Sequence, residues 1–536
     1  AAPLTAYGAR MRTNATTVAA LFFFLVAAAG FAAGADEQAT GPQRTLTISM
    51  AGDADTLDPH VTGARRAYTI MMNIFDTLVV KDVDNTYKPG LATDWSWNDE
   101  GTVYTFSLRD DVTFHDGTPF NAEAVVYNLD RIADPALQSR FATDALGPYE
   151  SSRAVDEYTV EITYSSPIAA SLLLDAFSQA YLGIISPTAG EEYGYEDFGR
   201  NPVGSGPFVF QEWTAQNRVT LVRNEEYDWA SEVYESDGPA WLEEITFITI
   251  PEDSTRAATL ETGESDVALE LGEEAIELFD QDPDFQIAKG DVPGCPIIFW
   301  MNVEHPILED VRVRQAILHA FDQNLLAETI YQGRVTPVFG PLSPVTWGYN
   351  PAVEEMYPYD LDRAAELLDE AGWVLNPDTG IREKDGARLE FDINDIIERR
   401  RIEFFQAQMR QVGIDVEANA VSSDTLFAIT READTYSMAS TWWAYSDPDV
   451  LRILYHSSNI GSGFAISRYA DPELDAMLEA ALGEIDPQAR RERYYEIQEF
   501  IMDKALMVPV YARLVHDGLK ANITGYRIDR GQYPVL

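Results

Sequence analysis

The sequence predicts an α/β protein with a large core. Short segments in which apolar and polar residues alternate, typical of strands, intermix along the whole chain with segments that have apolar residues at helical spacing. There is no fixed-period repeat of the kind that marks a solenoid or a propeller. The 536 residues are 46% apolar and 11% aromatic, which is enough to fill a core and argues against disorder. Their number suggests two to four structural units.

Strands and helices can be assigned to individual segments. Asn121 caps a predicted helix over residues 122–132, which Pro135 ends, and Asp360 caps a second over 361–368, with Gly372 as its stop. Asp471 and Pro472 open a third helix, which has Leu474, Met477, Leu478 and Ala481 on one face; the proline takes the first position, where no N–H is needed. Alternating patterns predict strands at residues 46–50, 104–108, 158–164, 245–247 and 389–393.

Two proline-containing stretches interrupt these patterns. Residues 291–296 (DVPGCP) lie mid-chain, and we expect a domain boundary there. Residues 507–510 (MVPV) follow the long helical segment near the C-terminus, but this stretch alone does not predict a domain boundary.

The charge excludes several classes of partner. There are 88 acidic and 38 basic residues, for a formal net charge of −50. A nucleic-acid binder needs a basic surface to neutralise phosphates, so we expect no nucleic-acid partner. The lysines are scattered, and no polybasic arm for anionic lipid is present. Cys295 is the only cysteine, which excludes an intramolecular disulfide, a CxxC redox pair and a cysteine zinc site.

The N-terminus predicts export. Residues 18–29 (VAALFFFLVAAA) follow Arg12 and precede a small-residue Ala-x-Ala site that ends at Ala35, a pattern typical of a secretory signal peptide. The run is short for a bilayer span, which needs about 20 residues. A buried helix is the alternative, but the acidic Asp36 follows at once. We therefore assign residues 1–35 to the signal peptide and an extension upstream of Met11, and expect a periplasmic protein with no direct membrane insertion.

The exported part is even more acidic. Residues 1–35 contain Arg10 and Arg12 and no acids, so their removal changes the net charge from −50 to −52. Such a surface stays solvated at high ionic strength, where charges are strongly screened. We expect a halophilic or salt-tolerant source.

The familiar catalytic motifs are incomplete. The histidines form no HExxH pair, which excludes a zincin. His115, Asp116 and Gly117 are interpreted as a turn, and a Gly-Ser-Gly run at 204–206 lacks the first glycine of a nucleophile elbow. Cys295, between glycine and proline with no adjacent base, is interpreted as a structural thiol. We expect no cofactor and no metal site.

Residues 441–449 (TWWAYSDPD) concentrate three large aromatic side chains and two carboxylates. In one interpretation the aromatic residues belong to the core and the acids cap a helix from Val450. In another the segment forms a pocket wall, because ligand sites are mostly apolar and aromatic with a few polar groups. A third hypothesis, a secreted hydrolase using Asp447 or Asp449, needs a second carboxylate or a histidine that the sequence does not identify.

Several landmarks together resemble a known family. They are DTLDPH at 55–60, LATDWSW at 91–97, VTFHDGTPFNAEAV at 112–125, PVGSGPF at 202–208, VRVRQAI at 311–317, LLDEAGW at 367–373 and QVGI at 411–414. In these the chain resembles the extracytoplasmic solute-binding proteins of family 5, the dipeptide-, oligopeptide- and nickel-binding components of ABC transporters. The resemblance runs almost end to end after the signal peptide.

The resemblance implies a two-lobed periplasmic binding protein of the type II-like, large peptide-binder class. Lobe I would comprise residues 36–290 and 505–536, with an extra subdomain near 80–203, and lobe II would comprise 291–504. Such a protein is a monomer and not an enzyme. It closes about a hinge on a peptide or small-molecule ligand and delivers it to an ABC permease and its ATPase.

The resemblance also implies a pocket at the aromatic segment. Peptide binders of the family carry an aspartate three positions before the Asp-Pro-Asp, where it pairs with the ligand's α-ammonium, but here that residue is Ala444. The ion pair is therefore absent at that position, which argues against a peptide with a free amino terminus. The resemblance leaves the ligand open among peptides, glutathione, an opine, a saccharide and a nickel chelate. The ligand-binding residues we expect are Trp442, Trp443, Tyr445 and Asp447, with Thr56 from the first loop.

Overall fold

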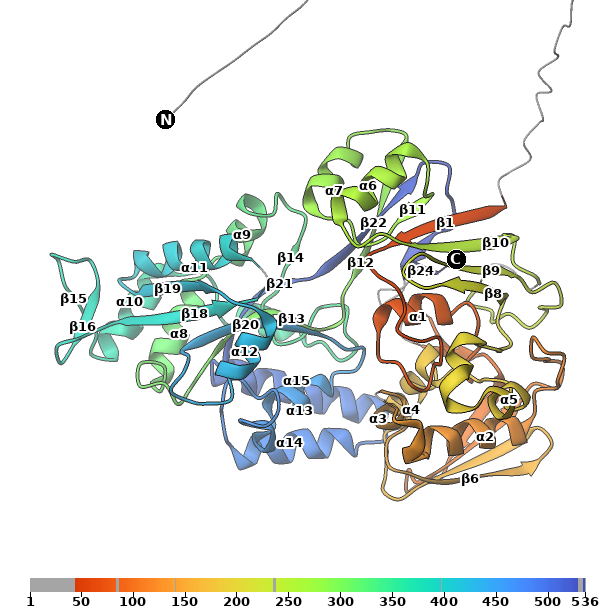
Figure 1. Cartoon of the computed structure of the whole chain (residues 1–536). Coiled ribbons are helices and arrows are strands. Elements are labelled where there is room, and N and C mark those ends of the chain that lie inside the picture. Colours follow the sequence, from red (N-terminus) through yellow and green to blue (C-terminus); the bar gives the residue numbers. More distant parts are fainter. Residues whose placement is uncertain are drawn as a thin grey trace, which may run out of the picture. The chain divides into compact units, whose positions relative to one another are not determined.

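The computed structural model describes residues 44–82, 86–139, 141–234, 238–396 and 398–528, and the backbone of 534–535. The predicted signal peptide lies outside these residues. Strands and helices alternate along the described chain, as the sequence predicts, and three larger sheets carry the architecture (Figure 1).

The first sheet has seven strands in the order β12-β22-β11-β1-β10-β9-β8. Strand β1 is parallel to β10 and β11, and the other pairs are antiparallel. The helices in the same part of the fold are α1 (Arg65–Met71), α6 (Asp253–Thr262) and α7 (Glu273–Phe279). The strands are β1 (Thr45–Met50), β8 (Phe208–Thr214), β9 (Arg218–Arg223), β10 (Glu244–Thr249), β11 (Val267–Ala268), β12 (Phe285–Asp291) and β22 (Leu514–Lys520).

A four-stranded antiparallel sheet, ordered β4-β5-β7-β6, lies in the same part of the chain and shares its apolar core. Helix α2 packs on β6 and β7, and α4 contributes Leu173 and Leu174 to the core. The elements are β2 (Val79–Lys81), β3 (Tyr87–Pro89), β4 (Ala92–Trp97), β5 (Val103–Leu108), α2 (Ala122–Ala133), α3 (Ala142–Leu146), β6 (Tyr149–Asp156), β7 (Thr159–Tyr164), α4 (Ala170–Ala176) and α5 (Pro187–Asp197).

The third sheet has six strands in the order β14-β21-β13-β20-β18-β19 and a separate core. Its strands are β13 (Gly294–Met301), β14 (Thr336–Pro337), β18 (Glu390–Asp395), β19 (Asp415–Ala420), β20 (Met438–Ala444) and β21 (Met507–Ala512). Its helices are α8 (Val311–His319), α9 (Gln323–Thr329), α10 (Leu361–Glu370), α11 (Arg399–Gln411), α12 (Ser423–Ile429), α13 (Val450–Tyr455), α14 (Pro472–Leu482) and α15 (Pro487–Asp503).

Small ribbons complete the fold. A three-stranded sheet combines β15 (Val374–Leu375), β16 (Arg382–Lys384) and β17 (Ala387–Arg388), and β23 (Arg527–Ile528) pairs with β24 (Pro534–Val535). In the described ranges, no helix has both the length and the apolar character that crossing a membrane requires.

The chain passes between the first and third sheets twice, at neighbouring points. Strand β12 continues through Val292 and Pro293 into β13, and β21 continues through Arg513 into β22. The two connections touch, because the Val292 amide donates to the Arg513 carbonyl at 3.0 Å. Gly294 opens β13 at φ +100, where an added Cβ would lie 2.4 Å from the Trp443 carbonyl oxygen, so both backbone conformation and space require glycine.

The predicted strands and helices are confirmed, with ends that differ by one or two residues. The predicted N-caps also form as expected. Asn121 accepts the Ala124 amide at 3.0 Å, Asp360 accepts the Arg363 amide at 2.9 Å, and Asp471 accepts the Glu473 amide at 2.8 Å. Each capping oxygen thus bonds an amide two or three residues further along the chain, so these caps can be predicted from the local sequence alone.

The two short motifs interpreted as architecture lie against each other. The His115 amide donates to the Gly204 carbonyl at 2.8 Å, and its Nε2 is 2.9 Å from the Gly206 carbonyl. Ser205 donates to Asp76, which also accepts the Trp229 indole N–H at 2.9 Å. The histidine and the serine therefore hold a turn together.

Candidate functional site

The two tryptophans of the aromatic segment lie at the end of β20 with different surroundings. Trp443 is half-buried against the second core, with its ring centroid 5.2 Å from that of Phe464 and 6.4 Å from that of Trp300. Trp442 is also half-buried beside this core, but it points to the other face of the strand, since side chains alternate. Its ring lies under the Arg513 guanidinium, with 4.1 Å from Cζ to the ring centroid.

The residues that follow run beside the first connection. Ala444 is exposed and pairs with Gly294 across the β13–β20 ladder. The Tyr445 amide donates to the Pro293 carbonyl at 3.2 Å. The Tyr445 side chain is half-buried, and burial together with the nearby Asp447 charge raises its pKa. Tyr445 is therefore a neutral phenol at any physiological pH.

The carboxylates of the Asp-Pro-Asp run are both engaged by arginines. Asp447 is buried and holds the buried Arg490 through two bonds of 2.7 and 2.8 Å, and it also accepts the Asp449 amide at 2.8 Å. Asp449 pairs with Arg452 at 2.7 Å. Burial alone would lower the pKa of Arg490, but the negative charge and the hydrogen bonds of Asp447 have the larger effect, so the pKa is raised. Both pairs stabilise the start of α13 and its contact with α15.

Thr56 lies in the loop after β1. Its hydroxyl accepts the Asp58 amide at 3.2 Å, and the next residue, Leu57, donates its amide to the Gly199 carbonyl at 3.1 Å. Thr56 thus caps the turn before Pro59. No contact between Thr56 and the aromatic segment is present in the described part of the chain.

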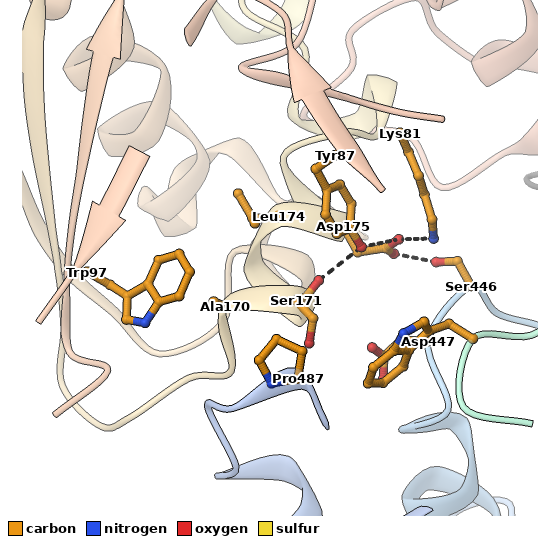
Figure 2. Close-up of a pocket in the computed structure, with 11 residues that line it drawn as sticks. Lys81, Tyr87, Trp97, Ala170, Ser171, Leu174, Asp175, Ser446, Asp447 and Pro487 are labelled. Carbon is orange, nitrogen blue, oxygen red and sulfur yellow. Dashed lines mark hydrogen bonds and ion pairs between the residues drawn. The ribbon is translucent and has the colours of Figure 1, made fainter. Parts of the chain in front are cut away.

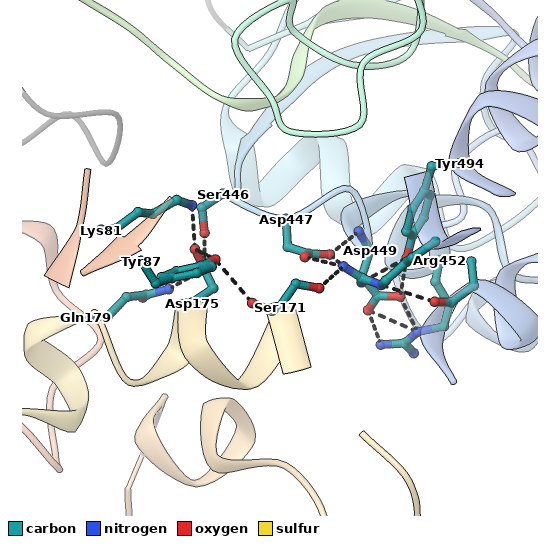
Figure 3. Close-up of polar contacts among 12 residues, drawn as sticks. Lys81, Tyr87, Ser171, Asp175, Gln179, Ser446, Asp447, Asp449, Arg452 and Tyr494 are labelled. Atoms are coloured by element: carbon teal, nitrogen blue, oxygen red, sulfur yellow. Dashed lines mark hydrogen bonds and ion pairs between the residues drawn. The ribbon is translucent and has the colours of Figure 1, made fainter. Parts of the chain in front are cut away.

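Helix α4, which the sequence did not single out, faces the aromatic segment (Figure 3). Its Asp175 accepts the Lys81 ammonium at 2.5 Å and the Gln179 amide at 3.0 Å, and it also accepts the Ser446 hydroxyl. Burial alone would raise the pKa of Asp175, but Lys81, Ser446 and Gln179 outweigh it, and the pKa is lowered. Asp175 is therefore a carboxylate that Ser446 and Lys81 hold in place.

A second contact lies one turn earlier on α4. Arg490 donates to the Ser171 hydroxyl at 3.1 Å while it holds Asp447. Helix α4 belongs to the first core, whereas Asp447 and Arg490 belong to elements around the second. Two hydrogen bonds, from Ser446 and from Arg490, thus join the two cores through one helix.

A cavity of about 180 Å³ lies beside these contacts (Figure 2). Most of its surface is apolar, with Lys81, Asp175 and Ser446 at one side. Of the residues predicted for the site only Asp447 lines it; Trp442, Trp443, Tyr445 and Thr56 do not. The lining residues are Lys81, Tyr87, Trp97, Ala170, Ser171, Leu174, Asp175, Trp347, Ser446, Asp447 and Pro487.

Sequence reasoning missed Lys81, Asp175 and Ser171 because each stands alone in its segment. The lysine lies on β2 and the aspartate on α4, 94 positions away. No spacing rule connects them, and only the tertiary fold brings them together. Among the described residues, no group of three or more His, Cys, Asp or Glu side chains is arranged to hold a metal ion.

Comparison with known proteins identifies the family. The model of "Bacterial extracellular solute-binding proteins, family 5 Middle" matches residues 86–462. The chain belongs to this family. Among its relatives, the glutathione-binding protein GsiB of Shigella flexneri is 27% identical over 500 residues, which cover 90% of this chain and 92% of that protein.

Solved structures of the family have the same fold. HbpA2 from Haemophilus parasuis matches with a TM-score of 0.79 and 26% identity, over 91% of this chain and 98% of that one. NikA from Brucella suis, in complex with Fe(III)-EDTA, matches with a TM-score of 0.78, 26% identity and the same coverage. The periplasmic protein DppA from Helicobacter pylori, in complex with the peptide STSA, has a TM-score of 0.69 and 26% identity over 92% and 98%.

Family membership decides between the hypotheses. Family 5 proteins are two-lobed α/β solute-binding proteins, so the chain is a substrate-binding protein and not an enzyme. The hydrolase hypothesis is not supported. Its two candidate acids, Asp447 and Asp449, are both neutralised by arginine partners.

Proposed function

We propose that the chain is the substrate-binding component of an ABC transporter. It captures a peptide or a similar small organic solute between two lobes and delivers it to a membrane permease and its ATPase. Family membership supports the class of protein. One relative is named for glutathione, and two similar structures hold the peptide STSA and Fe(III)-EDTA. Because these compounds differ so much, the class of ligand is part of the proposal.

We propose lobes with the predicted bounds: residues 36–290 and 505–536 in lobe I, with a subdomain near 80–203, and 291–504 in lobe II. The separate sheets and cores support this division. One bound needs adjustment: β21 (Met507–Ala512) pairs within the third sheet and packs in its core, so we propose that the return to lobe I begins at Arg513 rather than at 505. Two adjacent connections without other covalent links form a natural hinge.

The observation that carries the proposal is the contact between α4 of lobe I and the loop after β20 of lobe II. Ser446 donates to Asp175, and Arg490 donates to Ser171, so polar groups of one lobe are satisfied by the other. A ligand drives closure by binding the closed state more tightly than the open one. The two hydrogen bonds form where the lobes meet, so we propose that they add to the stability of the closed state, next to the proposed pocket segment of Trp442, Trp443, Tyr445 and Asp447.

The first experiment is native mass spectrometry of the purified protein, since a protein that closes on its ligand retains it. We expect a bound solute whose mass identifies its class. In parallel, melting is measured with peptides, glutathione, saccharides and a nickel chelate. A ligand at 100 times its Kd stabilises the folded state by about 2.7 kcal/mol. If no solute is retained and none of these compounds raises the melting temperature, the proposal is wrong.

Closure is tested with a matched pair of serine variants. Ser446→Ala removes a hydrogen bond to a carboxylate across the lobes, a bond of about 1.5–3 kcal/mol. We therefore expect the affinity for the solute identified above to fall about tenfold or more. Ser178→Ala is the control, because Ser178 donates to the Asp175 carbonyl within lobe I at 2.7 Å. Equal affinities of the two variants would exclude the contact as part of closure.

We further propose a periplasmic monomer, cleaved after Ala35, from a halophilic or salt-tolerant source. The family description as extracellular and the strong acidity support this. Light scattering after size exclusion is expected to give the mass of one chain. N-terminal sequencing of the exported protein is expected to begin at Asp36. A dimer mass, or an N-terminus before residue 18, would contradict these points.

A further inference from the structure

Arg513 occupies one of the two connections between the sheets. It is the single residue between β21 and β22, and its carbonyl oxygen accepts the Val292 amide of the other connection. Its guanidinium covers the Trp442 ring, 4.1 Å from Cζ to the centroid. The side chain therefore lies at the hinge and at the aromatic segment at once.

Arg513 lacks a counter-ion in a strongly acidic protein. Its side chain is half-buried, and burial lowers its pKa, which the more distant Glu270 only partly offsets. In the described part of the chain no carboxylate lies within ion-pairing distance of its guanidinium, and no acceptor receives a hydrogen bond from it. Glu270 instead pairs with Arg65 at 3.4 Å. A partly desolvated cation without a partner is costly, unless a ligand supplies the anion.

Three other buried arginines of the chain are paired with carboxylates. Arg131 holds Asp58, Arg401 holds Asp395 and Arg490 holds Asp447, each through paired hydrogen bonds. With 88 acidic residues against 38 basic ones, the sequence has carboxylates in excess to pair with each guanidinium. Arg314 is buried without a carboxylate as well, but it donates to backbone carbonyls instead, whereas Arg513 has neither kind of acceptor in the described part of the chain.

The surface next to Arg513 is apolar and open. Trp442 and Ala444 are two residues apart on β20 and point to the same face. Ala444 is exposed, so this face presents an indole ring and a methyl group beside the guanidinium. It offers an apolar floor to a ligand and leaves the hydrogen-bond donors of Arg513 available.

We propose that Arg513, Trp442 and Ala444 form an anion subsite that binds a carboxylate of the transported solute. The guanidinium presents two parallel N–H donors that match a carboxylate. The Trp442 ring packs against the carbon skeleton that bears it. The proposal rests on the proposed function and deepens it, because it assigns the ligand to carboxylate-bearing solutes. It also places the bound charge at the hinge, where both lobes can reach it.

The probe is benzoate, with neutral benzamide as its isostere, at constant ionic strength. Binding is followed on the full-length mature protein through the ¹⁵N indole signal of Trp442, assigned with Trp442→Phe. We expect saturable movement of this signal with benzoate and none with benzamide. In Arg513→Gln the affinity for benzoate should fall at least tenfold. In Arg513→Lys, which keeps the charge but loses the fork, an intermediate affinity is expected.

Arg200→Gln is the matched control. Arg200 also covers a tryptophan, 3.4 Å from the centroid of Trp213, but it is exposed and lies away from the connections. Its affinity for benzoate should equal that of the unmodified protein. Equal responses to benzoate and benzamide, or an unchanged affinity in Arg513→Gln, would overturn the subsite. If inorganic phosphate competes as well as benzoate does, the assignment to carboxylates is overturned.

The outcome can be separated from that of the proposed function. If a co-purified solute binds Arg513→Gln as tightly as the unmodified protein, the anion subsite is wrong and the transport function stands. A second outcome is that no solute is retained and none of the panel compounds raises the melting temperature, while the affinity for benzoate still falls in Arg513→Gln. In that case the transport function is wrong and the anion subsite stands.

Discussion

The pair of Asp447 and Arg490 allows a sharp test of whether Asp447 serves the fold or the ligand. In Asp447→Asn the shape is kept, but Arg490 loses its charged partner. The Arg490 side chain is 0% exposed and that of Asp447 4% exposed. Removing one partner of such a buried pair costs about 3–5 kcal/mol, because it leaves an uncompensated charge. We expect the free energy of unfolding to fall by that amount.

The measurement is urea denaturation at pH 7, followed by circular dichroism and by tryptophan fluorescence. The control is Asp111→Asn. Asp111 also holds an arginine, Arg109, through two bonds of 2.8 and 2.6 Å, but its side chain is 53% exposed. Exposed pairs contribute about 0–1 kcal/mol, so this variant should change little.

Two results would refute the reasoning. If Asp447→Asn lost no more stability than Asp111→Asn, the buried pair would not stabilise the fold. If instead it kept its stability and lost the affinity for the solute, Asp447 would be a ligand-binding residue, as the sequence alone suggests. A third variant, Asp447→Leu with Arg490→Met, should recover part of the loss, because it leaves no charge unpaired.

Three further predictions concern pH, backbone strain and salt. Burial raises the pKa of Asp517 from its ordinary value of 3.8 to about 6, so its stabilising contribution is present below about pH 4 and is lost as pH rises through 6. Relative to wild type, the free energy of unfolding of Asp517→Asn should gain up to about 3 kcal/mol between pH 3.5 and 7 in urea titrations, and a pH-independent difference would contradict this. Gly294→Ala should lower the free energy of unfolding by about 2–5 kcal/mol, because it adds backbone strain and overpacking. Gly380→Ala, at φ +70 with open space around it, should lower it by only about 1–3 kcal/mol in the same urea assay, and equal losses of stability would count against the contact at Trp443. The melting temperature should rise between 0.1 and 2 M NaCl, since screening relieves repulsion in a chain of net charge −50, and calorimetry giving a flat profile would argue against adaptation to salt.

Much of the architecture is accessible from the sequence because it is set locally. Asn121, Asp360 and Asp471 each cap the helix that begins next to them. Such a cap depends only on neighbouring residues, so it can be predicted without knowing the rest of the fold. Strand alternation is local as well where only one face of a strand is buried; β13 and β21, which are buried on both faces, show no such alternation. The landmark segments gave the family, and hence the two-lobed arrangement.

The site is less accessible, because its contacts join distant parts of the chain. Asp447 is conspicuous in the sequence, but its partner Arg490 lies 43 positions later, near the start of helix α15. Asp175 and Ser446 are 271 positions apart. The residue types of the aromatic segment suggest a pocket. The role of each side chain, however, depends on which partner lies next to it in the fold, and the packing of whole helices and strands determines that partner.

The position of β22 in the first sheet has a consequence for how the protein folds. This strand comes from the end of the chain, yet it lies between β12 and β11, and β12 has no other partner in the sheet. A chain that has been synthesised only as far as Arg513 cannot complete the sheet with which its described part begins. Completing it requires pairing over more than 200 positions, as between Gln286 and Leu519, which makes closure of this sheet a late and slow event. The nascent chain therefore remains incompletely folded at least until β22 has been made.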